Sequence, residues 1–282
     1  MCDTCGCNVT SGNRHLLAPP SGRNGLGQTP EKILGSLLQH NDRQAEANRA
    51  RLDGLGVLTV NLMSSPGAGK TALLEATIRQ LGGDLRIAVI EGDLETENDA
   101  DRIRALGVPA HQITTGTACH LDAHLVAQAL DALDLANLDV LFIENVGNLV
   151  CPASFDLGHH RNVALLSVTE GDDKPAKYPV MFRAADLMLV SKTDLLAYLP
   201  EFSPERAEGC LRNLASTAPA LRLSAKSGEG MAAWIGWLNA ELASYRAARL
   251  EHKTVLPKLQ PEGRLLHQSA PEVRFVPVQR SA

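Results

Sequence analysis

The sequence predicts an α/β fold with a mainly parallel β-sheet flanked by helices. From residue 57 onward, short runs of β-branched and aliphatic residues alternate with stretches of helical periodicity, a pattern typical of βα units. A glycine-rich turn, SSPGAGKT at 64–71, joins the first such run to the first helical stretch. The 282 residues suffice for one principal domain with appendages.

The expected elements follow in order along the chain. Strands are expected at 58–63, 85–90, 140–143, 164–168, 187–190 and 221–223. Helices of the domain are expected at 71–81, about 98–106, about 121–136, 204–215 and 230–250. Four regions result: a flexible metal-binding arm and linker at 1–28, an N-terminal helix at 29–52, the α/β domain at 53–250 and a loosely ordered tail at 251–282.

The ends of the chain are assigned from local composition. Residues 8–28 are rich in Gly, Pro, Ser and Asn, which predicts a flexible tether. Thr29 is a capping residue and Pro30 stands at the first helical position, which predicts a helix start. Four prolines and scattered charges after residue 250 predict a loose tail.

Charge and hydropathy limit the partners. The formal net charge of -5 and the pI near 6.0 argue against a nucleic-acid partner. No apolar run is long enough to span a membrane, and the N-terminus lacks the basic start and apolar segment of a secretory signal. We therefore expect a cytoplasmic protein that binds proteins and small ligands.

The turn at 64–71 has the composition of a phosphate-binding loop between a strand and a helix. Its backbone N–H groups can surround phosphates, Lys70 can reach the β- and γ-phosphates, and Thr71 can ligate Mg²⁺. Ser64 replaces the usual first glycine, and a plain glycine turn before a helix is the alternative. The nucleotide-binding residues expected here are Ser65, Pro66, Gly67, Ala68, Gly69, Lys70 and Thr71.

Two later segments favour guanine over adenine. The motif SKTD at 191–194 resembles the Asn-Lys-x-Asp motif of GTPases, in which Asp194 would accept hydrogen bonds from guanine N1 and N2. Ser191 replaces the asparagine, and Lys192 with Asp194 in a solvated turn is the alternative. A second base-contact loop is expected at Ser224, Ala225 and Lys226. GTP is therefore the expected nucleotide.

Acidic residues at two strand ends suit magnesium binding and water activation. Glu144 and Gly147 resemble an Asp-x-x-Gly switch, with the carboxylate holding Mg²⁺ or its water and the Gly147 N–H sensing the γ-phosphate. Asp93 orients either the attacking water or the metal. Asp99 and Asp101 are interpreted as solvated helix charges. The expected catalytic residues for slow GTP hydrolysis are Lys70, Thr71, Asp93 and Glu144.

Two groups of metal-binding side chains stand outside the nucleotide motifs. Cys119, His120 and Cys151 offer two thiolates and an imidazole to Zn²⁺ or Ni²⁺, with a position that a second chain could fill, or the cysteines are simply small buried residues. The N-terminal arm offers three thiolates, and loss of Met1 would add the amine of Cys2. This donor set favours Ni²⁺ in square-planar geometry; tetrahedral Zn²⁺ or a chance cluster of cysteines is the alternative. These thiolates are Cys2, Cys5 and Cys7. Cys210 is expected to be structural.

The motifs together resemble the HypB family, the nickel-incorporation GTPases of [NiFe]-hydrogenase maturation. The segments that carry the resemblance are CDTCGC at 2–7, SSPGAGKT at 64–71, EGDLETENDADRI at 91–103, GTACHLDA at 116–123, ENVGNLVCPASFDLG at 144–158, TEGDDKPAKYP at 169–179 and SAKSGEGM at 224–231. The resemblance implies a P-loop NTPase of the SIMIBI GTPase type that delivers nickel, or gates its insertion, into the hydrogenase large-subunit precursor. It also implies a small nickel-binding accessory protein as partner and a homodimer formed on GTP or metal binding.

The family pattern is not complete, and other functions stay open. Only His15 precedes His40, so the histidine-rich nickel store of many relatives is missing. The related urease accessory GTPases carry a Cys-Pro-His motif, whereas Ala153 follows Cys151 and Pro152 here. A metal sensor that uses GTP only as a conformational ligand and a metabolic P-loop kinase are the remaining alternatives.

Overall fold

The computed structural model describes residues 30–258 except 82, 94–96, 117 and 215, with side chains described from residue 38 onward. Seven strands form one sheet in the order β3-β2-β4-β1-β5-β6-β7, and every neighbouring pair is parallel. The strands are β1 (Leu58–Met63), β2 (Ile87–Asp93), β3 (Ala110–Thr114), β4 (Val140–Glu144), β5 (Arg161–Ser167), β6 (Leu187–Ser191) and β7 (Ala220–Arg222). The predicted parallel α/β fold is confirmed.

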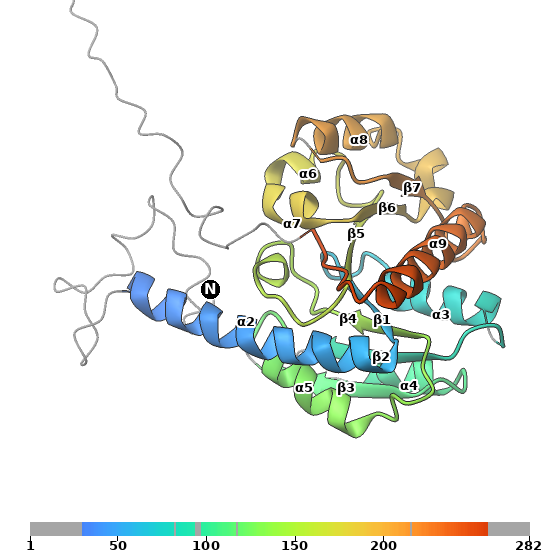
Figure 1. The fold of residues 1–282 in the computed structure, drawn as a ribbon. Helices are drawn as coiled ribbons and strands as arrows, with labels where there is room; N and C mark the ends of the chain where they lie inside the picture. The colour runs from blue at the N-terminus through green and yellow to red at the C-terminus, as the bar shows by residue number, and fades with distance from the viewer. Residues whose placement is uncertain (1–29, 82, 94–96, 117, 215, 259–282) are drawn as a thin grey trace, which may run out of the picture.

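Helices cover both faces of the sheet (Figure 1). The α-helices are α2 (Pro30–Leu55), α3 (Lys70–Leu81), α4 (Asn98–Arg104), α5 (Ala123–Ala132), α6 (Lys174–Lys177), α7 (Pro179–Ala184), α8 (Pro204–Asn213) and α9 (Met231–Leu250), with 3₁₀ turns η1 (Cys151–Ser154) and η2 (Thr193–Tyr198). The first half of α2 projects beyond the sheet, while its second half lies beside α5 (Figure 1).

Buried apolar side chains explain how the layers hold together. The central strands are buried along their whole length, as expected for a parallel sheet covered on both faces. On one face, α3 and α9 pack on Phe142, and the indole of Trp234 donates a 2.8 Å hydrogen bond to Thr77. On the other face, α5 and Leu52 of α2 pack on Ile143. These two cores, with a third around β5 and β6, fix the positions of the strand ends.

Some element boundaries differ from the sequence-based expectations. β3 was not expected, because its polar residues His111 and Gln112 hide the strand pattern at a sheet edge. α5 begins at Ala123 rather than about residue 121, because the Asp122 carboxylate accepts a 2.8 Å hydrogen bond from the Leu125 N–H and caps the helix. The short helices α6 and α7 were also not expected.

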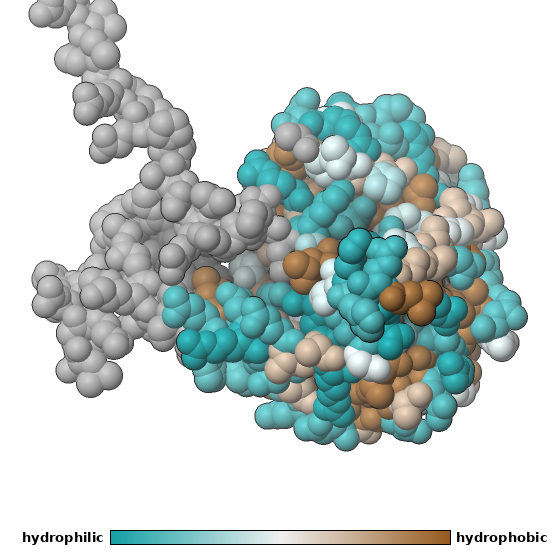
Figure 2. All heavy atoms as spheres, viewed as in Figure 1, coloured by the Kyte–Doolittle hydropathy of each residue, from teal (hydrophilic) through white to brown (hydrophobic). Residues whose placement is uncertain are grey.

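The surface is largely hydrophilic, with apolar residues in small groups on the face that Figure 2 shows. No helix within the described residues is long and apolar enough to cross a membrane. Because all strands are parallel, their carboxyl ends meet at one edge, which is where open α/β sheets bind ligands. The loops that follow β1, β2 and β4 therefore converge there.

Candidate nucleotide and metal sites

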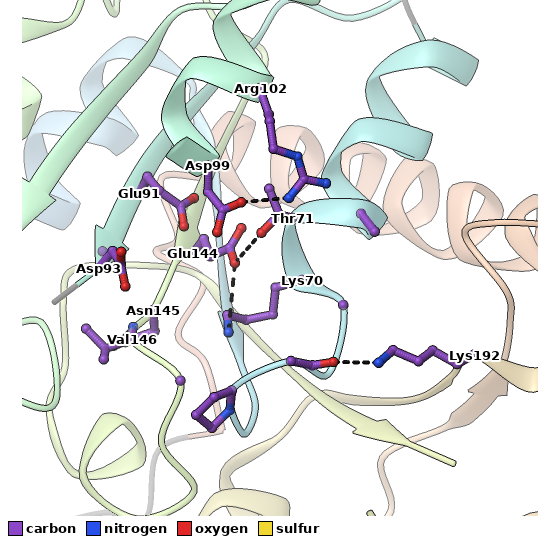
Figure 3. Close-up of a pocket in the computed structure, with 16 residues that line it drawn as sticks. Lys70, Thr71, Glu91, Asp93, Asp99, Arg102, Glu144, Asn145, Val146 and Lys192 are labelled. Atoms are coloured by element: carbon purple, nitrogen blue, oxygen red, sulfur yellow. Dashed lines mark hydrogen bonds and ion pairs between the residues drawn. The ribbon is translucent and has the colours of Figure 1, made fainter. Parts of the chain in front are cut away.

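A pocket of about 420 Å³ lies at the carboxyl ends of β1, β2 and β4 (Figure 3). The lining residues come from the glycine-rich loop, the start of α3, the ends of β2 and β4, and α4. They are Pro66, Gly67, Gly69, Lys70, Thr71, Ala72, Glu91, Gly92, Asp93, Asp99, Arg102, Glu144, Asn145, Val146, Gly147 and Lys192. The predicted catalytic residues thus share one pocket.

The glycine-rich loop presents Lys70 and Thr71 at the N-terminus of α3. Gly67 and Gly69 have φ of 73° and 99°, values that a side chain would strain. The Lys70 ammonium is buried, donates to Ser64 Oγ at 3.1 Å and lies 3.8 Å from Glu144 Oε1. A buried cation at a helix N-terminus, with backbone N–H groups around it, suits a phosphate chain.

Two buried carboxyl groups face each other beside Thr71. The Thr71 hydroxyl donates a 3.0 Å hydrogen bond to Glu144 Oε1, and the second oxygens of Glu91 and Glu144 are buried without a hydrogen-bond partner. Burial, followed by the neighbouring Glu144, raises the pKa of Glu91 to about 11. Burial also raises the pKa of Glu144, although Lys70 opposes the rise. Unpartnered carboxylate oxygens beside a hydroxyl fit Mg²⁺.

Sequence reasoning left two residues out of this cluster. Glu91, Asp99 and Glu144 place carboxylate oxygens within 4.8 Å of one another. Asp99, interpreted from sequence as a solvated charge, lines the pocket and accepts a 2.7 Å hydrogen bond from Arg102, whereas Asp101 is exposed. The signal for Glu91 was available, because a glutamate lies two residues before the end of β2 and another glutamate ends β4. Asp93 also lines the pocket, at the end of β2.

The two loops expected to contact the base lie together next to the glycine-rich loop. Lys192 has a left-handed backbone, with φ of 61°, and its ammonium donates to Gly67 O at 2.6 Å. The Ser224 hydroxyl donates a 2.6 Å hydrogen bond to Asp194 Oδ1, which orients that carboxylate. Of the expected base-contact residues, Lys192 lines the pocket, while Lys226 is exposed in the turn after Ser224 and Ala225.

The loop after β4 touches the glycine-rich loop and ends at a cysteine. A Cβ on Gly147 would lie 2.8 Å from Pro66 Cα, so only glycine permits this approach. Four residues later Cys151 opens η1 and is buried. The loop therefore connects the nucleotide pocket to a potential metal ligand.

The structure brings Cys119, His120 and Cys151 together. The Cys119 thiol donates to Cys151 Sγ at 3.3 Å and lies 3.8 Å from His120 Nδ1. His120 stacks on Phe155, with ring centroids 4.0 Å apart, and burial lowers its imidazole pKa. Two thiols and a neutral imidazole within 4.8 Å of one another form a donor set that fits Zn²⁺ or Ni²⁺.

One further cysteine within the described residues, Cys210, is not part of this cluster. The expected arm ligands Cys2, Cys5 and Cys7 lie outside the described residues. Cys210 is half-buried on α8. The candidate metal ligands that the structure describes are thus those of the α/β domain.

Comparisons with known proteins agree in both sequence and structure. The family model described as CobW/HypB/UreG, nucleotide-binding domain, matches residues 58–222. The hydrogenase maturation factor HypB of Azotobacter vinelandii is 50% identical over 242 residues, which are 85% of this chain and 80% of that protein. The hydrogenase/urease maturation factor HypB of Helicobacter hepaticus is 48% identical over 211 residues, 73% of this chain and 86% of the relative. The solved structure of HypB from Helicobacter pylori in complex with nickel has a TM-score of 0.70 and 42% identity, over 73% of this chain and 96% of that one.

Proposed function

Because this chain belongs to the HypB family, within the wider CobW/HypB/UreG group, we propose that it is a GTP-hydrolysing nickel metallochaperone for hydrogenase. It delivers nickel, or gates nickel insertion, into the hydrogenase large-subunit precursor. One observation carries the proposal: the loop that leaves the pocket at Glu144 passes Gly147 and ends at Cys151, 3.3 Å from Cys119. One loop therefore joins a nucleotide pocket to a metal-binding cluster.

Hydrolysis is assigned to residues of the pocket. Lys70 neutralises the phosphates, Thr71 and Glu144 hold Mg²⁺, and Asp93 orients water or metal. Asp194, fixed by Ser224, reads the guanine. When bound, Mg²⁺ would supply charge neutralisation at the phosphates. Turnover is slow because hydrolysis serves as a switch.

Metal transfer is assigned to two sites. Cys119, His120 and Cys151 form the domain site, which holds Ni²⁺ or Zn²⁺ and leaves a position for a second chain. The Gly147 N–H binds the γ-phosphate, and this contact shifts the loop that carries Cys151. The nucleotide state thereby changes the affinity of the site for metal. By linkage, metal also changes nucleotide affinity. The homodimer forms on GTP or metal binding.

We also propose roles for the regions on either side of the GTPase domain. Residues 1–28 form an arm whose Cys2, Cys5 and Cys7 hold Ni²⁺, and residues 251–282 form a tail; the helix at 29–52 and the GTPase domain at 53–250 lie between them. The protein acts in the cytoplasm, and its partner is a small nickel-binding accessory protein. It binds neither nucleic acid nor membrane.

The test is deletion of the gene in its host, with hydrogenase and urease assayed with and without added nickel. We expect hydrogenase alone to be lost and excess nickel to restore it at least in part. Complementation with Lys70→Ala and Cys151→Ser should fail at low nickel, while Glu208→Gln, which alters an exposed ion pair with Arg222, should succeed. Intact hydrogenase in the deletion strain would remove the proposal and favour a metal sensor, and loss of urease would favour the urease assignment.

A further inference from the structure

The two segments that carry the domain-site ligands are joined by three asparagine amides. The first segment, residues 119–123, holds Cys119 and His120; the second, residues 148–157, holds Cys151. Asn148 belongs to the second segment: its amide N–H donates to Cys119 O at 3.2 Å, and its oxygen accepts from the Val150 N–H at 2.9 Å. One side chain thus connects the backbone of one ligand residue with the backbone next to the other.

The other two asparagines come from α2, far away in sequence. Asn41 accepts a 2.9 Å hydrogen bond from the Ala123 N–H and donates to Asp156 O at 2.8 Å. Asn48 donates to Ala123 O at 2.8 Å and to Leu157 O at 3.1 Å. Each amide therefore contacts both segments.

These contacts belong to a tightly built interface. Asn41 is 4% exposed and Asn48 is 3% exposed, although both stand on an otherwise polar helix. Arg49 donates two hydrogen bonds, at 2.6 and 2.7 Å, to the Asp156 carboxylate. A Cβ on Gly158 would lie 2.5 Å from the Asn48 Cβ, so α2 packs directly against the chain after the second segment. Buried amides with all these partners hold a specific geometry rather than a general contact.

We propose that Asn41 and Asn48 of α2 are positioning residues for the Cys119–His120–Cys151 metal site. By bridging Ala123 to Asp156 and Leu157, they would hold the two segments, and with them the two thiols, at a fixed separation. The inference rests on the proposed function, because it requires these side chains to bind metal. It adds that the site depends on the docking of α2, the helix next to the proposed metal-binding arm, as well as on the nucleotide loop.

The consequence is a second input to the metal site. The nucleotide acts through the loop from Glu144 to Cys151, whereas α2 acts through the hydrogen bonds of Asn41 and Asn48. Anything that displaces α2 would remove the bridges and let the thiols separate. Residues that hydrogen-bond to metal ligands affect metal affinity by about 10- to 100-fold, and Asn41 and Asn48, which bond to the chain near the ligands, should act at the lower end of that range.

The test uses the full chain with Cys2, Cys5 and Cys7 replaced by serine, so that only the domain site contributes. Ni²⁺ is titrated against a chromophoric chelator while the thiolate-to-nickel absorption band is recorded. We expect Asn41→Ala and Asn48→Ala to weaken Ni²⁺ binding by about 10-fold or more and to alter the band. Asn41→Asp keeps the acceptor for the Ala123 N–H but sets a buried carboxylate oxygen against Asp156 O, so it should weaken Ni²⁺ binding at least as much as Asn41→Ala.

Arg51→Ala is the matched control on the same helix, because Arg51 pairs with the exposed Asp131 and contacts neither segment. It should leave affinity and band unchanged. GDP affinity and the melting curve report whether each variant folds, and Asn41→Ser, whose hydroxyl can donate and accept hydrogen bonds, is used if Asn41→Ala does not fold. Folded Asn41 and Asn48 variants with the parent's affinity and band would overturn the positioning role. A parent that binds no Ni²⁺, or a band that survives Cys119→Ser and Cys151→Ser, would instead overturn the metal site, and the positioning role with it.

Discussion

Glu91 and Glu144 are register partners on the neighbouring parallel strands β2 and β4, and both side chains are buried. Two carboxylates so close cannot both ionise without a compensating charge. Burial and Glu144 raise the pKa of Glu91 to about 11, so without a cation Glu91 keeps its proton and donates a hydrogen bond to Glu144. A bound Mg²⁺ would take the place of that proton.

Glu91→Gln should therefore separate stability from metal binding. The pKa of Glu91 in the folded state lies above its ordinary value of 4.5. The folded protein therefore loses stability as the pH rises from 4.5 toward the folded-state pKa. Glutamine has no proton to lose, so the variant does not show this loss. We expect the metal-free variant to gain about 1 kcal/mol at neutral pH, or roughly 2–4 °C in Tm. Its Mg²⁺-dependent GTP affinity should fall about 10-fold, because one charged ligand is lost.

Calorimetry without Mg²⁺ and nucleotide titration at several Mg²⁺ concentrations measure these two effects. Glu208→Gln, which alters an exposed ion pair with Arg222, is the control for a lost surface charge. A lower Tm together with unchanged Mg²⁺ dependence would show that Glu91 is an ionised structural residue instead.

The hydrogen bond from Ser224 to Asp194 should contribute to guanine affinity. Ser224→Ala removes the 2.6 Å contact that orients the carboxylate, and we expect GTP to bind about 10-fold more weakly, the effect of a charged hydrogen bond worth roughly 1.5 kcal/mol. Asp194→Asn should lose GTP but accept xanthosine triphosphate, because its amide can donate to the xanthine 2-oxygen. Fluorescent nucleotide titration measures both. Unchanged GTP affinity in Asp194→Asn would place base recognition elsewhere.

The fold and the glycine-rich loop between β1 and α3 could be predicted because their signals are local. Runs of aliphatic residues alternate with helical stretches, and the glycines of the loop stand beside Lys70 and Thr71. β3 was missed because an edge strand with His111 and Gln112 lacks the apolar run of a central strand. Local patterns thus identify elements whose residues face the core.

Residues whose role depends on tertiary contacts could not be predicted. Asp99 looks like a surface helix charge until α4 is placed at the pocket. Asn41 and Asn48 stand in a polar stretch that suggests a solvated helix, yet both are buried against chain segments 75 to 115 residues away. Only the packing of α2 onto α5 reveals that these amides face inward.

Metal binding should protect two thiols of the domain from modification. The Sγ atoms of Cys119 and Cys151 lie 3.3 Å apart, whereas Cys210 stands alone on α8. In a chain whose arm cysteines are serine, Ni²⁺ or Zn²⁺ should slow the reaction of Cys119 and Cys151 with a thiol reagent and leave Cys210 unaffected. A chelator should restore reactivity. Equal protection in the Cys119→Ser variant would mean that the metal does not bridge the two sulfurs.

Acid should destabilise the domain through His159, which is fully buried beside Asp156 and Arg49. Burial lowers the pKa of His159 to about 4. As the pH falls below the ordinary pKa of 6.5, His159 is therefore protonated in the unfolded chain but not in the folded chain. The contribution of His159 to the free energy of unfolding is therefore fully present above about pH 6.5, and up to about 3 kcal/mol of it is lost as the pH falls to about 4. Asp156 acts in the same direction: although burial opposes it, His159 and Arg49 hold the pKa of its carboxyl below the usual value.

His159→Asn removes the imidazole while keeping an acceptor for the Leu157 N–H. We expect the variant to be less stable at neutral pH, because a void replaces part of the ring, but to lose less stability on acidification. The slope of the free energy of unfolding against pH should fall by about half rather than vanish, because burial also lowers the pKa of His160. Urea denaturation over the same pH range measures the slope, with His252→Asn on the surface as control. If His159→Asn and the parent lost stability in parallel, the acid sensitivity would have to come from His160 and Asp156, and His159 would take up its proton near the ordinary pKa in the folded as well as the unfolded state.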